Sequence, residues 1–475
     1  MKSLALNLVR IVSLLAACAI PIQIDAQQAQ QQQTYPHKRY TVTDLGPAGN
    51  PFSQATYVNN PGLVTGSDTA PDGTQHAVLW YEARFTDISQ PGLGGSNSGA
   101  GGANDFGQVI GGAETSEKDP NDENFCGYGT GLQCLAFLWQ NGVITALPTL
   151  GGTNAGYGQI NNWGEIAGYA EEDKVDPDCP GTVAVNGLGP QVLYFEPVIW
   201  EPTPRQIRKL PPLPGDSVGV AFSINDRDQA VGMTGTCANT VLPGPSAAPH
   251  AVLWEKDGTV RDLGNLGGTV NPQVLAVGNA ALLINNHGQV AGVSALPEIK
   301  STACPGDPPN PNCFPFHPFL WTRETGMRDL GVLPGDFVGA GLGLNNNGEV
   351  VGPSFPAPGP TGASPRAFLW ANGKMHDLNA LVPPHSPLYL LFAYAINDFG
   401  EIAGFGVETG SGDVHAFLAT PCDRSLSDTD WCRNDHGSAA TEADSTIERP
   451  TVVLSQTSRK LLPHLLRFGR TASQQ

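Results

Sequence analysis

One turn motif occurs seven times in this chain of 475 residues and constrains its fold more than any other feature. The motif has the form Asn-x-x-Gly, as in Asn161-Asn162-Trp163-Gly164, and Asp228 replaces the glycine in one copy. The asparagines that begin the copies are Asn59, Asn104, Asn161, Asn225, Asn285, Asn345 and Asn397. A spacing of 45 to 64 residues between copies indicates a repeat protein in which each copy is one supersecondary unit.

Each copy of the motif predicts a β-hairpin. Asparagine suits the first position of a type I turn, because its side chain can bond the backbone two residues further on. Glycine at the fourth position suits a left-handed backbone that closes the turn with a bulge, and aspartate tolerates that conformation next best. A second glycine ends each hairpin motif and predicts a close approach of two backbones. These glycines are Gly66, Gly111, Gly168, Gly232, Gly292, Gly352 and Gly404.

A run of apolar residues follows each hairpin, as in His250-Ala251-Val252-Leu253-Trp254. Because the run does not alternate, it predicts a strand that is buried on both faces. Six of the eight tryptophans stand at the end of this run, where we expect them to contact a neighbouring sheet rather than a ligand. Turn signals such as Asp257-Gly258 then lead to a fourth strand, so each unit has four short strands.

The two ends of the repeat region are out of phase. Residues 40–46 resemble a lone fourth strand, and residues 415–418 form a third strand with no fourth strand after it. This offset predicts that the first segment completes the last sheet, which removes two exposed sheet edges. We therefore predict an all-β fold, a seven-bladed β-propeller over residues 40–420. An open solenoid would instead need atypical capping repeats.

The repeat resembles the HAF-repeat family of predicted extracellular proteins, named for the motif that stands here at His415-Ala416-Phe417. The resemblance covers residues 40 to about 420 and rests on the Asn-x-x-Gly turn, the aromatic third strand and the Asp-Leu-Gly ending. It does not predict the strand pairing of copies 3 and 4. These copies carry Glu196-Pro197-Val198 in place of the name motif, and Leu147-Pro148 and Leu210-Pro211 in place of Asp-Leu-Gly. The resemblance implies export and a propeller fold, but no activity.

The two termini predict an exported chain that is secreted, periplasmic or on the cell surface. Residues 1–26 have the charged flank, apolar stretch and small-residue cleavage site of a signal peptide. The apolar stretch is too short to span a bilayer, although Cys18 within it offers a lipid anchor as an alternative. Residues 27–39 predict a glutamine-rich disordered spacer. Residues 421–475 predict a polar tail that a disulfide ties near its start.

Eight cysteines remain after removal of the signal peptide, and an even number in an exported chain predicts disulfides. Their positions in the loops predict four pairs: Cys126 with Cys134, Cys179 with Cys237, Cys304 with Cys313, and Cys422 with Cys432. Zinc thiolates are the alternative, and the lack of any Cys-x-x-Cys spacing disfavours them.

The net charge of the chain is −19, and it is unevenly distributed. The first 39 residues are net positive by three and residues 421–475 are neutral, so the repeats carry about −22. Such a field disfavours nucleic acid and anionic membranes as partners. The long loops between second and third strands fall on one face, where binding residues are expected. Two of these loops are acidic, and they are either solvated or a calcium site. Their acidic residues are Glu114, Glu117, Asp119, Asp122 and Glu123, and Glu171, Glu172, Asp173, Asp176 and Asp178.

No motif for catalysis or cofactor binding is present, since the chain lacks a Gly-x-Ser-x-Gly elbow, a phosphate loop and a histidine cluster with metal-ligand spacing. We predict a monomeric binding or scaffold protein that uses loops on one propeller face, with an extracellular glycan or protein as ligand. The alternative is an extracellular hydrolase that acts on polysaccharide through carboxylates at the channel mouth, a pair defined by spatial separation alone. A structural surface-layer role is a third hypothesis.

Overall fold

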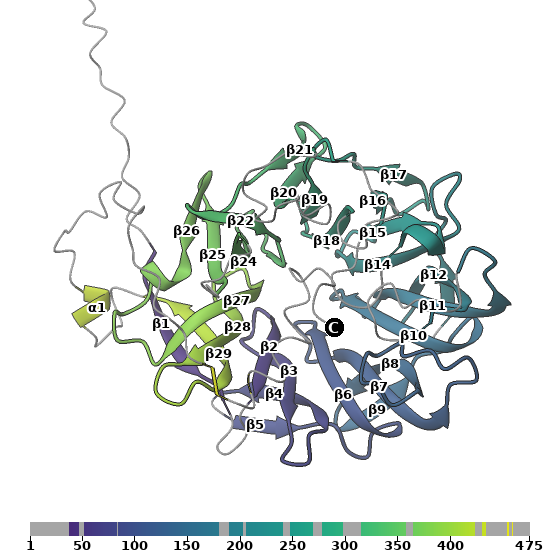
Figure 1. Ribbon diagram of the computed structural model, residues 1–475, viewed down its shortest axis with the longest axis horizontal. Coiled ribbons are helices and arrows are strands. Elements are labelled where there is room, and N and C mark those ends of the chain that lie inside the picture. The colour runs from purple at the N-terminus through teal and green to yellow at the C-terminus, as the bar shows by residue number, and fades with distance from the viewer. Residues whose placement is uncertain are drawn as a thin grey trace, which may run out of the picture. The chain divides into compact units, whose positions relative to one another are not determined.

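The computed structural model describes residues 38–46, 52–82, 84–179, 190–202, 206–240, 248–268, 278–297, 315–357, 364–422 and 430–433, with Leu454, Ser455 and Ser458. The predicted signal peptide with Cys18, nearly all of the spacer, most of the tail, and Cys304 with Cys313 lie outside these residues. The unit that begins at Lys38 is a ring of seven antiparallel sheets around an axis (Figure 1), as predicted.

Six blades follow one another along the chain, and the seventh combines its two ends. Blade 1 comprises β2 (Ser53–Val58), β3 (Val64–Thr69), β4 (Gln75–Tyr81) and β5 (Arg84–Asp87). Blade 2 comprises β6 (Gly94–Ala103), β7 (Val109–Lys118), β8 (Leu132–Gln140) and β9 (Val143–Ala146). Blade 3 comprises β10 (Gly151–Ile160), β11 (Ile166–Val175), β12 (Leu193–Trp200) and β13 (Ile207–Lys209). Blade 4 comprises β14 (Val218–Ile224), β15 (Ala230–Gly235), β16 (His250–Trp254) and β17 (Val260–Asp262).

The remaining blades have the same order, with one interruption. Blade 5 comprises β18 (Ala280–Ile284), β19 (Val290–Ala295), β20 (Phe316–Thr322) and β21 (Gly326–Asp329). In blade 6 the inner strand is divided into β22 (Asp336–Gly339) and β23 (Gly343–Leu344), before β24 (Val350–Pro356), β25 (Arg366–Ala371) and β26 (Lys374–Asp377). Blade 7 comprises β27 (Leu388–Ile396), β28 (Ile402–Glu408), β29 (Val414–Pro421) and β1 (Tyr40–Asp44). The described residues contain one short α-helix, α1 (Asp430–Arg433).

The N-terminal strand closes the ring. Strand β1 pairs antiparallel with β29, so that Tyr40 lies opposite Pro421 and Asp44 opposite Phe417 (Figure 1). The pairing makes β1 the outer strand of the last sheet, which confirms the predicted closure. Because the two strands come from opposite ends of the repeat region, every sheet of the ring has four strand positions and none is left incomplete.

A charged pair joins the third and fourth strands of most blades. In four blades a histidine Nδ1 lies 2.8 to 3.1 Å from an aspartate carboxylate. These pairs are His76–Asp87, His250–Asp262, His317–Asp329 and His415–Asp44. Blade 3 reverses the charges, with Glu196 on β12 and Lys209 on β13 at 3.1 Å. The departing motifs lie in blade 2, which carries Leu147-Pro148, and in blade 3, which carries Glu196-Pro197-Val198 and Leu210-Pro211. Both blades keep the common pairing of third and fourth strands.

The glycine that ends each motif lies where the inner strand has a bulge or a break. A Cβ atom at Gly232 would collide with the carbonyl oxygen of Val220, and the corresponding collision occurs at all seven glycines. At six of the seven glycines a third-strand aromatic ring crowds the same position, as Trp254 does beside Gly232. The predicted close backbone approach is confirmed, and it explains why no larger residue stands there.

The core lies between neighbouring sheets. The tryptophans at the ends of the third strands are mostly buried, and the indole N–H groups of two of them reach the preceding crossover. Trp200 Nε1 donates to the carbonyl oxygen of Pro148 at 2.9 Å, and Trp254 Nε1 donates to that of Pro211 at 2.7 Å. The Leu-Pro segments of copies 2 and 3 thus supply acceptors for the next blade.

Three disulfides join Cys126 to Cys134, Cys179 to Cys237, and Cys422 to Cys432. The second disulfide connects loops of blades 3 and 4, and the third ties α1 to the end of β29. Among the described residues, no helix has the length and apolar character needed to cross a membrane.

Candidate functional site

The seven Asn-x-x-Gly turns join the first and second strands, and their asparagines all line one pocket on the ring axis. Within a turn the asparagine Oδ1 accepts backbone N–H groups, as Asn104 does from Phe106 and Gln108 at 3.1 Å. The fourth residue has a positive φ in every copy, including Asp228 at 58°. The predicted turn geometry is therefore confirmed, with aspartate adopting the left-handed conformation.

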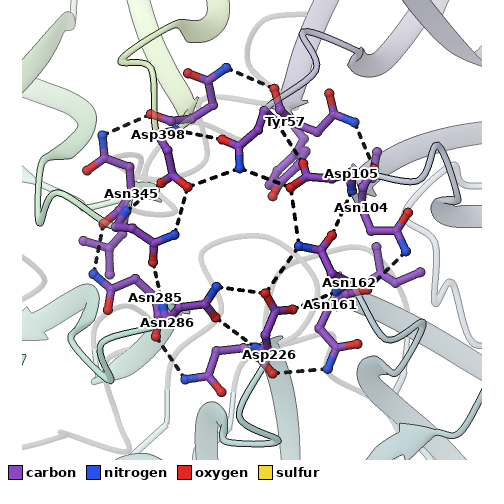
Figure 2. Close-up of a pocket in the computed structure, with 18 of the residues that line it drawn as sticks. Tyr57, Asn104, Asp105, Asn161, Asn162, Asp226, Asn285, Asn286, Asn345 and Asp398 are labelled. Atoms are coloured by element: carbon purple, nitrogen blue, oxygen red, sulfur yellow. Dashed lines mark hydrogen bonds between the residues drawn. The ribbon is translucent and has the colours of Figure 1, made fainter.

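The turn asparagines form a closed circle of hydrogen bonds between blades. Each side-chain Nδ2 donates to the backbone carbonyl of the equivalent asparagine in the next blade, at 2.9 to 3.2 Å (Figure 2). The last bond runs from Asn397 in blade 7 to Asn59 in blade 1. All seven side chains are buried, so the circle is a second closure of the ring in addition to β1.

The residue after each turn asparagine forms a second circle, which lines the pocket. Its members are Asn60, Asp105, Asn162, Asp226, Asn286, Asn346 and Asp398. Each backbone N–H donates to the side-chain Oδ1 of the next member, at 2.8 to 3.0 Å. The side chains surround a partly open cavity of about 120 Å³ at the end of the ring that carries these turns, which we call the turn end (Figure 2).

Three carboxylates and four amides alternate irregularly around this pocket. The amide of Asn60 donates to Oδ2 of both Asp105 and Asp398 at 3.1 Å, and that of Asn286 donates to Asp226 at 2.8 Å. No residue that lines the pocket in the described part of the chain is cationic. The pocket therefore has a negative potential and presents oxygen acceptors to hydroxyl, ammonium or hydrated groups.

Tyr57 extends into the same pocket from β2 (Figure 2). Burial, followed by the charges of Asp105, Asp398 and Asp226, raises the pKa of the Tyr57 phenol. The phenol consequently stays protonated and can donate a hydrogen bond, whereas the surrounding carboxylates can only accept one.

The third residue of each turn directly follows a residue that lines the pocket. In three of the four adjacent blades 7, 1, 2 and 3 this residue is a solvent-exposed aromatic: Phe399 is 71%, Phe106 is 77% and Trp163 is 67% exposed. Trp163 is held in place because its Nε1 donates to the carbonyl oxygen of Asp226 at 2.9 Å. Together we call Phe399, Phe106 and Trp163 the aromatic rim. Exposed aromatic groups of this kind mark interaction sites more often than isolated surface residues do.

The two acidic loops predicted from the sequence meet at the opposite end of the ring. Asn154 Nδ2 donates to Asp119 at 2.9 Å and to Glu171 at 3.0 Å, and Gln191 Nε2 donates to Glu123 at 3.1 Å and to Glu171 at 2.9 Å. Burial, with the Glu123 charge, raises the pKa of Glu171 to about 8, and burial raises that of Glu123. The side chains of Asp119, Glu123 and Glu171 are all buried.

The other acidic residues of these loops do not join this network. Glu114 is buried and accepts from Asn97 Nδ2 at 2.8 Å, whereas Glu117, Asp122, Asp173 and Asp178 are exposed. In the described residues the one group with metal-ligand spacing is Asp176 with Cys179 and Cys237, and those cysteines form a disulfide. Calcium in the acidic loops stays a prediction.

The sequence analysis did not identify the pocket or its rim. A signal was present, because the residue after the turn asparagine is Asn or Asp in all seven copies. Either residue suits a surface turn, so composition alone does not separate a turn from a pocket. The aromatic rim occupies only three of the seven copies and is therefore absent from the repeat pattern.

No protein-family model matches the chain, and no curated protein sequence is similar to it. Solved propeller structures resemble its fold at very low sequence identity. An oligogalacturonate lyase in complex with manganese aligns over 80% of this chain and 93% of its own, with 11% identity and a TM-score of 0.42. An acylaminoacyl peptidase of Pyrococcus horikoshii aligns over 80% of this chain and 53% of its own, with 10% identity and a TM-score of 0.43. A gluconolactonase of Xanthomonas campestris aligns with 8% identity and a TM-score of 0.34, over 80% of this chain and 89% of its own.

Proposed function

We propose that this protein is an exported, non-catalytic binding module that recognises a glycan at the turn end of its ring. The observation that supports this proposal is the position of the aromatic rim beside an open pocket of amides and carboxylates. Aromatic faces provide a rigid apolar surface for the C–H face of a sugar ring, and a few convergent polar groups fix orientation. Three disulfides are compatible with export.

The size and charge of the pocket restrict the ligand. A cavity of about 120 Å³ accommodates a hydroxymethyl or amino substituent but not a whole sugar ring, so the ring would lie on the aromatic rim. Asp105, Asp226 and Asp398 accept hydrogen bonds from hydroxyl or ammonium groups and repel anions. We therefore infer a neutral or amino-substituted glycan rather than an acidic one.

The sequence led us to expect binding on the face that carries the long loops between second and third strands, which we call the insertion-loop end. The site proposed here lies at the opposite end of the ring. In the described residues, the carboxyls that the two acidic loops bring together, Asp119, Glu123 and Glu171, are buried, whereas the turn end has the open pocket and the aromatic rim. A ligand needs accessible groups, so accessibility favours the turn end.

The hydrolase hypothesis receives less support from the same geometry. Glycoside hydrolysis needs one carboxyl that carries a proton to the scissile bond. Of the carboxyls with raised pKa values, Glu123, Glu171, Asp176 and Asp377 are buried. Glu165 and Glu196 are half-buried and accept hydrogen bonds from Asn161 Nδ2 and Lys209 Nζ. The carboxylates at the pocket accept hydrogen bonds from backbone N–H groups and amides. Binding without turnover is thus the function that the arrangement favours.

The test is a glycan-array screen of the exported chain, followed by calorimetry with any neutral or amino-sugar oligosaccharide that binds. We expect Trp163→Ala and Phe106→Ala each to weaken binding at least about tenfold, since loss of one stacking anchor costs over 1 kcal/mol. Val175→Ser is the control, because Val175 is an exposed apolar residue on β11 at the other end. Binding that survives both aromatic substitutions, or turnover of the bound glycan, would contradict the proposal.

A further inference from the structure

One buried carboxylate at the insertion-loop end lacks a hydrogen-bond partner on one oxygen. Asp176 follows β11 and is 1% exposed. Its Oδ1 accepts the backbone N–H of Asp178 at 2.9 Å, whereas Oδ2 is buried without a partner among the described residues. A carboxylate oxygen of Asp176 and the sulfurs of Cys179 and Cys237 all lie within 4.8 Å of one another. The unpartnered carboxylate thus faces the disulfide that connects blades 3 and 4.

The oxidation state of the two cysteines determines whether Asp176 Oδ2 can accept a hydrogen bond from them. Disulfide sulfurs carry no hydrogen, whereas each thiol of the reduced pair is a donor. A buried acceptor without a donor destabilises the state that contains it. The disulfide state therefore carries a cost that the dithiol state can remove through an S–H···O hydrogen bond to Asp176.

The protonation of Asp176 fits the same role. Burial raises the pKa of Asp176, and the neighbouring Asp178 carboxylate acts in the same direction, while the Asp178 N–H and Lys174 oppose it. Burial, followed by the charge of Asp176, raises the pKa of the Tyr194 phenol on β12. A carboxyl with a raised pKa beside a sulfur can deliver a proton to a departing thiolate.

We propose that Cys179–Cys237 is a reversible redox site, reduced by a dithiol, in which Asp176 carries the proton. Cys179 is half-buried and Cys237 is 3% exposed, so attack falls on Cys179 Sγ. A thiolate of the dithiol bonds to Cys179 Sγ, the Cys179–Cys237 bond breaks, and the electron pair leaves on Cys237 Sγ. That sulfur takes the proton of Asp176, which is restored from water.

The second half of the reaction releases the reductant. The other thiol of the dithiol loses its proton to water and attacks the mixed disulfide, and the Cys179 thiolate that leaves is protonated by water. One dithiol is oxidised to a disulfide and one protein disulfide is reduced to two thiols. Reduction would remove the covalent link between the loop after β11 and the loop after β15.

The test is a redox titration of the whole exported chain in mixtures of reduced and oxidised dithiothreitol. Alkylation and peptide mapping report the state of each cysteine pair separately. Asp176→Asn keeps an Oδ1 acceptor for the Asp178 N–H but replaces the unpartnered Oδ2 with an amide nitrogen, which cannot accept a hydrogen bond from a thiol of the reduced pair. We expect the equilibrium constant for reduction of Cys179–Cys237 to fall about tenfold in this variant, which is about 30 mV for a two-electron couple.

Two controls define the result. The midpoint of Cys422–Cys432 in the same molecules is expected to stay unchanged, as is that of Cys179–Cys237 in Asp173→Asn, because Asp173 is exposed on β11. An unchanged midpoint in Asp176→Asn, or an equal shift in Asp173→Asn, would overturn the proposal.

A second pair of variants tests the hydrogen bond if Asp176→Asn does not fold. Serine hydroxyls can donate to Asp176 Oδ2 and alanine methyl groups cannot. We therefore expect the variant C179S/C237S to melt a few degrees above C179A/C237A. An alanine variant that melts at the same temperature or higher would contradict the role of Asp176.

Discussion

The two ends of this ring are built in different ways. The turn end consists of seven short copies of one motif, which are joined by two circles of hydrogen bonds. The insertion-loop end consists of loops of unequal length, held by disulfides and by the buried carboxyls around Asn154. The comparison shows that repetition supplies closure at one end, and that individual cross-links stabilise the other.

The largest effect should come from breaking closure itself. Deletion of residues 40–46 removes β1, whose Tyr40 is fully buried and donates its N–H to Leu381 at 2.9 Å. The last sheet would expose the edge of β29, and we expect a loss of several kcal/mol, or a fall in the melting temperature of over about ten degrees. Thermal unfolding followed by circular dichroism measures it. An unchanged melting curve would show that the hydrogen-bond circles close the ring without β1.

The repeated glycine provides the next test. Gly232→Ala places a methyl group against the carbonyl oxygen of Val220, a backbone atom that cannot move away cheaply. We expect a loss of about 3 kcal/mol in the free energy of unfolding. Gly99→Ala is the matched control, since its nearest contact at 3.5 Å is ordinary and the expected loss is below about 1 kcal/mol. Equal losses measured by urea unfolding would remove the steric explanation.

The asparagine circle can be tested at one blade. Asn161→Ala removes the 3.1 Å bond to the carbonyl oxygen of Asn225 and the acceptor for the N–H groups of Trp163 and Glu165. We expect a loss of about 2 kcal/mol, because buried backbone groups lose their partners. The double variant with Asn285→Ala tests whether the seven asparagines stabilise the ring cooperatively. Strict additivity in the unfolding free energies would mean that the copies act independently.

The contribution of the insertion-loop end to stability should fall as the pH rises toward 8. The pKa of Glu171 is raised to about 8 in the folded chain, so the folded state holds a proton that the unfolded state releases above about 4.5. The contribution of Glu171 to stability is therefore complete at acid pH and is lost as the pH rises toward 8. We expect Glu171→Gln to reduce the fall in unfolding free energy between pH 6 and pH 9. An identical fall in the variant would exclude Glu171 as its source.

The smallest effect concerns the pair that fastens β1 to β29. The hydrogen bond that His415 donates to the Asp44 carboxylate raises the pKa of His415, whose contribution to stability is present at low pH and is lost as the pH rises through the raised value. Against the effect of burial, His415 and the Gly46 N–H lower the pKa of Asp44, whose contribution is lost as the pH falls through the lowered value. Stabilisation is therefore greatest between the ordinary pKa values of the two groups. Melting temperatures at pH 5.5 and pH 8.5 should differ by one or two degrees less in His415→Gln than in the unsubstituted chain.

Much of the fold follows from residues that repeat. The turn asparagines, the motif glycines and the out-of-phase ends predict seven blades and their closure, because each acts through local backbone geometry that is the same in every copy. The network of Asp119, Glu123 and Glu171 could not be predicted in the same way. It depends on which loops the blade geometry brings together, and Asn154 and Gln191, which connect the carboxyls, belong to no motif.

The site illustrates the same limit. Insertion loops are the usual place for binding residues, and that generalisation predicts a ligand at the insertion-loop end, whereas our proposal places it at the turn end. Phe106 and Trp163 are ordinary turn residues in the sequence. Only the ring brings them to the same end of the molecule, next to residues that line the pocket, since they are 57 positions apart in the chain.

The asparagine circle has a direction, because every blade donates one amide to the next blade and accepts one from the blade before it. The same hydrogen bond therefore occurs at every boundary between blades, including the boundary between blade 7 and blade 1, where the two ends of the repeat region meet. The order of blades in space is then independent of the position of the termini. Circular permutation at any crossover, with residues 421 and 40 connected, would give the same molecule with its ends at another blade.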